Sequence, residues 1–157
     1  MFTFKDYYDN VVKLSFEREP FSKYPKHVWV ICRYKDQWLL TRHKRRGVEF
    51  PGGKVEEGEV AHEAAKREVL EETGGIVKNL HYIGQYSVSG KGGTIVKNIY
   101  FAEIEKVEAQ PTYYETNGPV LFSKLPNDFS GYQYSFMMKD EVLPNSLKRI
   151  EELSLYA

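Results

Sequence analysis

Cysteine and net charge are both nearly absent from this chain. Cys32 is the only cysteine in 157 residues, which excludes an internal disulfide and indicates a reducing compartment. It lies in an apolar run that begins at Val28, where we expect a buried and unreactive thiol. Lysine plus arginine and aspartate plus glutamate number 22 each, so no global field attracts nucleic acid or a membrane surface. A polyanionic ligand therefore requires a local basic patch.

Long hydrophobic runs are also missing. The start of the chain lacks the basic and then apolar layout of a secretory signal, and no apolar run reaches the about 18 residues of a membrane helix. We therefore expect a cytoplasmic protein with no membrane partner and no obligate protein partner. The length and the 41% hydrophobic content predict a single domain over residues 1–157, large enough to bury a core.

Acidic residues are concentrated on one predicted helix. An alanine-rich stretch from Ala61 favours a helix, and Gly74 is typical of its end. Glu68, Glu71 and Glu72 occupy positions i, i+3 and i+4, so their carboxylates share one face and repel by about 0.2–0.5 kcal/mol per pair. A solvated face is the ordinary explanation of such a run. A bound Mg²⁺ or Mn²⁺ is the alternative, because these hard cations take carboxylate oxygens as ligands.

A glycine-rich loop precedes this helix. Residues 50–59 read FPGGKVEEGE, and glycines allow the backbone of a tight loop to approach a ligand closely. Gly52 can present its carbonyl oxygen without a side chain in the way. Glu59 and Arg67 are opposite in charge and eight residues apart, so we expect the Arg67 guanidinium to clamp the loop, Gly53 included, against the helix.

Loop and helix together resemble the Nudix box, the signature of a family of hydrolases. That pattern is a glycine, five residues, a glutamate, seven residues, Arg-Glu, an aliphatic residue, any residue, Glu-Glu, any residue, a glycine and an aliphatic residue. The matching positions are Gly53, Glu59, Arg67, Glu68, Val69, Glu71, Glu72 and Gly74. Gly75 stands where an aliphatic residue is usual. The resemblance implies an α/β fold, the Nudix α/β/α sandwich with a mixed β-sheet between helices, and a requirement for Mg²⁺ or Mn²⁺.

The resemblance also implies individual roles for the acids. Glu68 is the position marked as catalytic, which orients or deprotonates the attacking water, and it is a metal ligand as well. The other candidate ligands within the box region are Glu71, Glu72 and the carbonyl of Gly52. Family members often recruit one more acid from outside the box as a metal ligand or general base. Glu115 is the best match, with an ordinary loop glutamate as the alternative reading and Glu103 and Glu105 as weaker candidates.

The densest basic segment directly precedes the glycine loop. It is either a solvated hairpin loop or a source of cations for substrate phosphates that metals do not hold. The candidates for phosphate binding are Arg42, Lys44, Arg45 and Arg46, with Arg33 as an outside candidate. The four histidines have no partners at metal-ligand spacing and receive no role.

Hydrophobic patterns predict the remaining elements. Strands are expected within residues 1–17 and at 27–34, 38–42, 80–88, 94–104 and 120–122, and helical segments at 135–143 and 145–153 on either side of Pro144. Residues 89–93 form a glycine tract that is either a simple turn or a lid over the site. The stripe Leu147, Ile150 and Leu153 is predicted to pack on the sheet.

The segments FPGGKVEEGE and ETNGPVLFSKLP resemble the MutT-type branch of the family, and within it bacillus-type enzymes described as 8-oxo-dGTP diphosphatases and RNA pyrophosphohydrolases. This resemblance implies cleavage of the 5′-triphosphate of a free nucleoside triphosphate, possibly oxidised, or of an RNA end, to leave a 5′-monophosphate. ADP-ribose hydrolases of the family carry a proline shortly past the box, and none occurs between Gly74 and Pro111. A non-catalytic nucleotide-sensing domain is the alternative, which the complete acid set opposes.

Overall fold

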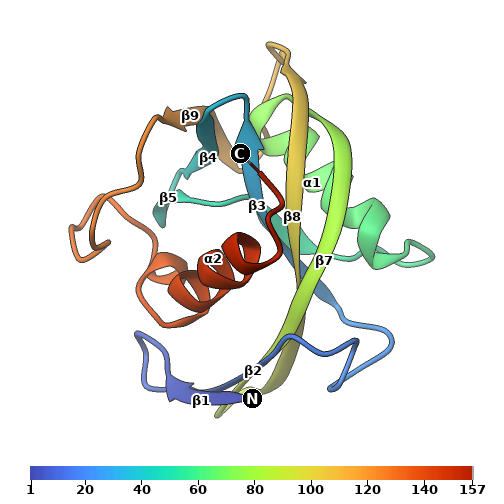
Figure 1. Ribbon diagram of the computed structural model, residues 1–157, viewed down its shortest axis with the longest axis vertical. Coiled ribbons are helices and arrows are strands. Elements are labelled where there is room, and N and C mark those ends of the chain that lie inside the picture. Colours follow the sequence, from blue (N-terminus) through green and yellow to red (C-terminus); the bar gives the residue numbers. More distant parts are fainter. Residues whose placement is uncertain (157) are drawn as a thin grey trace.

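The computed structural model describes residues 1–156, and its longest elements form one hairpin. Strand β7 (Gly75–Gly90) and strand β8 (Gly93–Val107) curve along the whole molecule, as Figure 1 shows. Their pairing continues to Gly90 opposite Gly93, so only Lys91 and Gly92 make the turn. The predicted hairpin and its turn within residues 89–93 are confirmed, but the turn is shorter than expected because Ser89, Gly90 and Gly93 belong to the strands.

The described strands build one mixed sheet. The other strands are β1 (Phe2–Lys5), β2 (Val11–Ser15), β3 (His27–Tyr34), β4 (Gln37–His43), β5 (Gly47–Glu49), β6 (Gly52–Lys54) and β9 (Thr116–Phe122). The sheet order is β1-β2-β7-β8-β3-β4-β5, in which β8 and β3 run parallel and the other neighbours run antiparallel. On the side away from β8, the first half of β3 pairs with β6 and the second half with β4. The sheet therefore forks at β3.

Strand β3 forms because its residues are apolar on both faces. Trp29 and Ile31 pack into one core, and Val28, Val30 and Cys32 pack into the other. An unbroken apolar run is typical of a strand that is covered on both sides. The Cys32 thiol is buried as predicted, and burial raises its pKa, which makes it unreactive.

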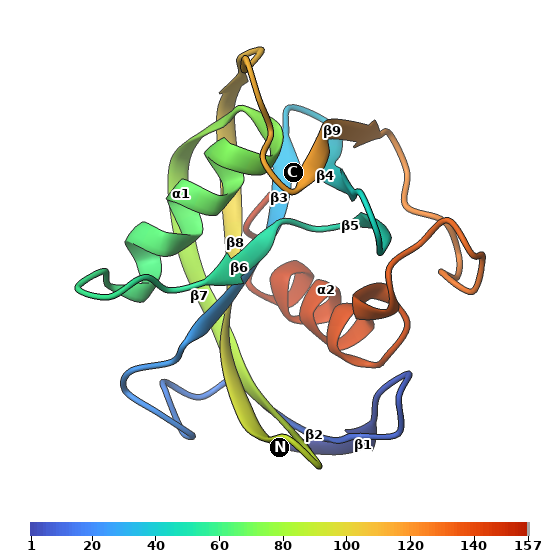
Figure 2. The same ribbon diagram turned by 180° about the vertical axis from the view of Figure 1, so that it is seen from behind.

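One helix covers each face of the sheet. Helix α1 (Ala61–Thr73) presses Ala64, Ala65 and Val69 against the core, and small side chains let it lie close to the strands. It ends at Gly74, whose positive φ of 77° is the left-handed cap that the sequence predicts. In both Figure 1 and Figure 2, helix α2 (Val142–Glu152) lies on the opposite side of β8 from α1. The predicted mixed sheet between helices is confirmed.

The end of the chain differs from the sequence-based expectation. Pro144 does not separate two helices; it lies in the first turn of α2, where its missing N–H has no helical partner to lose. Before it, only Phe136–Met138 forms a 3₁₀ turn. Ile150 is buried, but Leu153 caps the helix and is 41% exposed. Neither helix in residues 1–156 has the length and apolar character needed to cross a membrane.

Candidate active site

A cavity of about 610 Å³ lies where β6, α1 and the start of β3 meet, and we call it the site cavity. The predicted acidic residues Glu68, Glu71, Glu72 and Glu115 all line it, together with Gly52 and Gly53. The first three extend from α1, and Glu115 comes from the loop before β9. The fold therefore brings together the candidate metal ligands from two distant parts of the chain.

The two glycines of β6 make room for the acids. A Cβ atom on Gly53 would lie 2.6 Å from the carboxyl carbon of Glu68, which is closer than real Cβ contacts allow. The N–H of Gly52 donates to Oε2 of Glu72 over 3.3 Å. A strand without side chains here lets the carboxylates of α1 reach the backbone and the cavity behind it.

Arg67 holds the glycine loop against α1. Its Nε and Nη2 donate to the two oxygens of Glu59 at 2.8 and 3.0 Å, and Nη2 also donates to the Lys54 carbonyl at 2.9 Å. Glu59 in turn accepts the N–H of Glu56. The hydrogen bonds from Arg67 hold the pKa of Glu59 below its ordinary value, and the pKa of the Arg67 guanidinium is raised. A bidentate, charge-assisted pair of this kind fixes geometry as well as charge.

Arg67 also engages two acids of the cluster. Its Nη1 lies 2.7 Å from Oε1 of Glu68 and 3.3 Å from Oε2 of Glu71. In the part of the chain that the structure describes, no three His, Cys, Asp or Glu side chains are already arranged around a common point that could hold a metal ion. The reason is local: Glu68 and Glu71 face the guanidinium. As candidate metal ligands, these two side chains are thus engaged by Arg67.

Glu72 shows that the cluster is suited to a cation. Its side chain is buried, and burial, a hydrogen bond with Glu68 and the negative charges of Glu68 and Glu49 raise its pKa far above the ordinary value. The carboxyl group therefore keeps its proton at neutral pH unless positive charge arrives. Divalent cations such as Mg²⁺ bind carboxylate oxygens, so this donor set fits such an ion.

Two threonines anchor the end of α1 below the site. Thr41 Oγ1 and Thr116 Oγ1 lie 2.9 and 3.1 Å from the Glu72 carbonyl, one of the helix-terminal carbonyls that lack a helical partner. Both threonines are buried, on β4 and at the start of β9. Sequence reasoning missed them. The only signal for Thr41 was a polar residue after an apolar run, and Thr116, between Glu115 and Asn117, gave none.

Glu115 lies in an exposed loop at the edge of the site cavity. The N–H of Lys44 donates to the Glu115 carbonyl over 3.2 Å, which ties this loop to the end of β4. The alternative acids do not line the cavity: Glu103 faces His81 at 3.3 Å, and Glu105 is exposed elsewhere on β8.

The basic segment contributes less than its sequence position suggests. Only Arg46 lines the site cavity, whereas the other candidates are exposed and lie outside it: Arg42, Lys44 and Arg45. Arg42 is exposed near the end of β4, and the other two lie in the turn that follows. Arg33 stacks between Trp38 and Tyr156, 4.6 Å from each ring centre, and is not in the cavity either.

Arg46 is already paired. Its Nε and Nη2 donate to the two oxygens of Glu49 at 2.9 and 2.8 Å, and Glu49 is only 1% exposed. Hydrogen bonding to Glu49 is the main cause that raises the pKa of Arg46. The positive charge of Arg46 is therefore largely balanced within the protein. Lys97, which sequence reasoning did not consider, also lines the site cavity.

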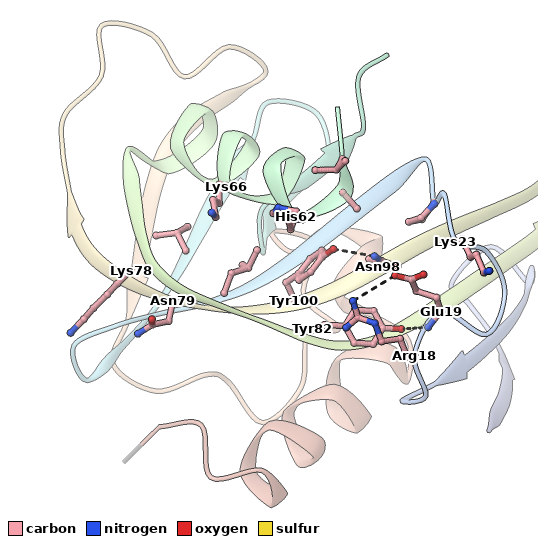
Figure 3. A pocket seen from close by; sticks show the side chains of 15 residues that line it. Arg18, Glu19, Lys23, His62, Lys66, Lys78, Asn79, Tyr82, Asn98 and Tyr100 are labelled. Carbon is pink, nitrogen blue, oxygen red and sulfur yellow. Dashed lines mark hydrogen bonds and ion pairs between the residues drawn. The ribbon is translucent and has the colours of Figure 1, made fainter. Parts of the chain in front are cut away.

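A second cavity of about 590 Å³, the flank cavity, lies among the start of α1, β7, β8 and the loop between β2 and β3 (Figure 3). Its charged lining residues are Arg18, Glu19, Lys23, Lys66 and Lys78, together with His62. Tyr82, Asn98 and Tyr100 form its polar floor. None of the residues predicted for the site lies there.

Comparison with known proteins identifies this arrangement. A model described as "NUDIX domain" matches residues 23–152. YtkD of Bacillus subtilis (strain 168), provisionally named an 8-oxo-dGTP diphosphatase, is 63% identical over 153 residues, 97% of each chain. The oxidized purine nucleoside triphosphate hydrolase of Mus musculus is 31% identical over 140 residues, covering 73% of this chain and 89% of the mouse protein.

Solved structures agree at the level of the fold. The crystal structure of the Bacillus subtilis pyrophosphohydrolase BsRppH, an alanine variant of one glutamate, superposes with a TM-score of 0.96 and 61% identity over 98% of each chain. A NUDIX hydrolase from Nitrosomonas europaea superposes with a TM-score of 0.62 at 20% identity, covering 82% of this chain and 89% of that one. At that identity the likeness concerns the fold alone.

Proposed function

This chain belongs to the Nudix family and is a pyrophosphohydrolase, and from that premise we propose that the site cavity hydrolyses a 5′-polyphosphate to a 5′-monophosphate. The candidate substrates are a nucleoside triphosphate, including an oxidised one such as 8-oxo-dGTP, and the 5′-triphosphate end of RNA. The observation that carries this proposal is the convergence of all four predicted carboxylates, with several cations, on one cavity. The names of the similar proteins support both kinds of substrate.

The acidic cluster would hold the metal that the family requires. We propose Mg²⁺ or Mn²⁺, held by Glu68, Glu71, Glu72, Glu115 and the Gly52 carbonyl. When bound, the cation supplies positive charge to the phosphate oxygens in the transition state. Turning Glu68 and Glu71 toward the cation releases them from Arg67, which retains its two bonds to Glu59 and so keeps the loop in place.

Glu68 is our candidate for the residue that activates water, with Glu115 as a second candidate. The water oxygen forms a bond to phosphorus while the anhydride bond on the opposite side breaks. The leaving group takes the electron pair of that bond: it is pyrophosphate if the α-phosphorus is attacked and the 5′-monophosphate if the β-phosphorus is attacked. A proton of the water passes to the carboxylate. Glu68 lies against Gly53 and beside Glu72, so it is close to both the loop and the buried acid.

We propose further that residues 1–157 act as one cytoplasmic domain. All residues assigned to the site come from this chain, so the chemistry requires no protein partner.

The test compares hydrolysis of 5′-triphosphate RNA, dGTP and 8-oxo-dGTP by one preparation, with Mg²⁺ and with Mn²⁺. We expect at least one substrate to be converted to its 5′-monophosphate, and the order of rates to show whether RNA or a free nucleotide is preferred. Absence of turnover on all three substrates, or binding without turnover, would contradict the proposal.

A further inference from the structure

Three nitrogen-bearing side chains lie in register across three strands at the site cavity. His27 on β3 is opposite Lys97 on the parallel strand β8 and opposite Lys54 on the antiparallel strand β6. Side chains that are directly opposite one another on neighbouring strands share a face of the sheet. All three line the site cavity. We call Lys97, His27 and Lys54 the cationic row.

The cationic row lacks negative partners among residues 1–156. Neither lysine forms an ion pair with a carboxylate in this part of the chain. The Nδ1 atom of His27 is buried and has no hydrogen-bond partner there. Arg46 differs, because Glu49 balances it. Lys97 and Lys54 are therefore the cations of the cavity without a carboxylate partner in this part of the chain, and His27 adds an unpartnered ring nitrogen beside them.

Charges that are withdrawn from water without a partner are unfavourable, and the row shows this effect. Burial lowers the pKa of the Lys97 ammonium to about 8. Burial and then the charges of Lys97 and Lys54 lower the pKa of His27, which agrees with the three groups lying close together. An anionic ligand would offset this penalty for Lys97 and favour the charged form of His27.

The geometry points to a phosphate or pyrophosphate group as that ligand. We propose that the cationic row binds the phosphoryl groups of the substrate that the acidic cluster does not hold. The row offers ammonium donors that carry no acceptor, which suits a phosphate oxygen better than a neutral base edge. It shares one cavity with the acids of α1, so a polyphosphate can reach both. This inference rests on the proposed function and assigns its phosphate-binding residues.

The decisive measurement uses isothermal titration calorimetry. It determines the Kd of the whole chain for inorganic pyrophosphate and for inorganic phosphate in the presence of EDTA. Without divalent cations the acidic cluster repels these anions, so the signal reports the row. We expect Lys97→Met to raise the Kd for pyrophosphate at least about 10-fold and Lys54→Met, at an exposed position, about 3-fold. Lys97→Arg should retain most of the affinity, since it keeps the charge.

Lys13→Met is the matched control, because Lys13 is an exposed lysine on β2 outside the cavity. It should leave the Kd unchanged. If Lys97 had only a structural role, Lys97→Met would lower the melting temperature and leave the Kd for pyrophosphate unchanged. We expect the melting temperature of Lys97→Met to hold or rise, since an apolar side chain of similar length removes an unpaired charge.

The outcomes separate this inference from the proposed function. Unchanged pyrophosphate and phosphate affinity in both methionine variants would overturn the inference even if the enzyme hydrolyses its substrates normally. Failure of the wild-type chain to hydrolyse any triphosphate would overturn the proposed function, whatever the row binds. Equal affinity for the two anions would mean that the row binds one phosphoryl group, and tighter binding of pyrophosphate would mean that it binds two. Either result supports the inference.

Discussion

The site cavity and the flank cavity are similar in volume but differ in how their charges are balanced. The flank cavity carries its cations on exposed side chains, and its one acid, Glu19, lies 3.9 Å from Arg18. In the site cavity Glu72 is buried beside other acids. Among residues 1–156, Lys97 has no carboxylate partner and Nδ1 of His27 has no hydrogen-bond partner. Solvated charges contribute little to stability, whereas charges without partners in a partly closed cavity are unfavourable, and a ligand of opposite charge relieves them.

The polar side chains on the floor of the flank cavity form hydrogen bonds within the protein. Gln85 is buried, accepts the N–H groups of Phe21 and Ser22 and donates to Asn98. Tyr82 donates to the carbonyl of Glu17 and accepts from the N–H of Glu19. These bonds hold the loop between β2 and β3 on the long hairpin. The difference between the cavities teaches that unsatisfied groups, and not cavity size, locate the chemistry.

The largest contrast is expected in catalysis. Glu68→Gln keeps the size of the side chain and removes its charge, so kcat should fall by about 10²–10⁴-fold, the usual contribution of a general base. Lys66→Gln, on the same helix but in the flank cavity, should keep kcat within about 2-fold. Steady-state kinetics on the best substrate checks both, with melting temperatures as the folding control. Near-normal turnover by Glu68→Gln would exclude Glu68 as the residue that activates the water.

Divalent cations should stabilise the protein through the site cavity alone. At 100 times the Kd, binding to the folded state contributes about 2.7 kcal/mol, or about 5–10 °C in melting temperature for a chain of this size. Thermal unfolding with EDTA, Mg²⁺ and Mn²⁺ measures the shift. The shift should shrink in Glu72→Gln and persist in Lys66→Gln. Equal shifts in these two variants would place the metal elsewhere.

The raised pKa of Glu72 predicts a pH dependence in EDTA. The folded state keeps a proton on Glu72 that the unfolded chain releases above about pH 4.5, so stability falls as pH rises toward the folded pKa. The slope reaches at most about 1.4 kcal/mol per pH unit. Between about pH 7 and 8 Asp140 contributes little, because its pKa is raised only to about 6. Lys97, whose pKa is lowered to about 8, releases its proton in the folded state within this window and adds a smaller change of opposite sign, so the comparison of wild type with Glu72→Gln isolates the share of Glu72.

Urea unfolding at about pH 7 and about pH 8 gives this slope. Glu72→Gln has no proton to lose at this position, so the fall in stability with rising pH should disappear. Lys66→Gln should leave the slope unchanged. A wild-type slope that matches that of Glu72→Gln would mean that Glu72 is ionised in the folded protein despite its burial.

The smallest effects are expected when the flank cavity itself is altered. The double variant Lys66→Gln, Lys78→Gln should change the free energy of unfolding by no more than about 0.5 kcal/mol, as surface substitutions usually do. Hydrolysis of dGTP and of 5′-triphosphate RNA should both stay within about 2-fold. A fall on RNA alone would break the comparison, because it would show that the flank cavity has a ligand of its own.

The acidic half of the site was predictable because its determinants are local. Helical spacing and the preceding glycine loop place Glu68, Glu72 and the partners of Arg67 within a short stretch of sequence. The boundaries of β3 were likewise readable from its unbroken apolar run. In these regions neighbouring residues alone decide the structure.

The cationic half was not predictable because strand pairing assembles it. Lys97 reaches His27 only through the parallel register of β8 and β3, and nothing in the sequence specifies that register. Nearness in sequence favoured Arg42, which is exposed on β4 and does not line the cavity. Thr116 meets Glu72 for the same reason as Lys97: distant strands come together at one helix end.

The fork in the sheet at β3 gives the two halves of that strand different neighbours, with different ties to the rest of the molecule. Strand β6 is joined to β3 at three register positions only, and β4 pairs with a separate part of β3. A displacement of β6 would therefore move Gly52, Gly53 and Lys54 together, while the pairing of β3 with β4 and β8 stays intact. Any opening of the cavity at this edge would have to break these three register positions and the hydrogen bond from Arg67 to the Lys54 carbonyl.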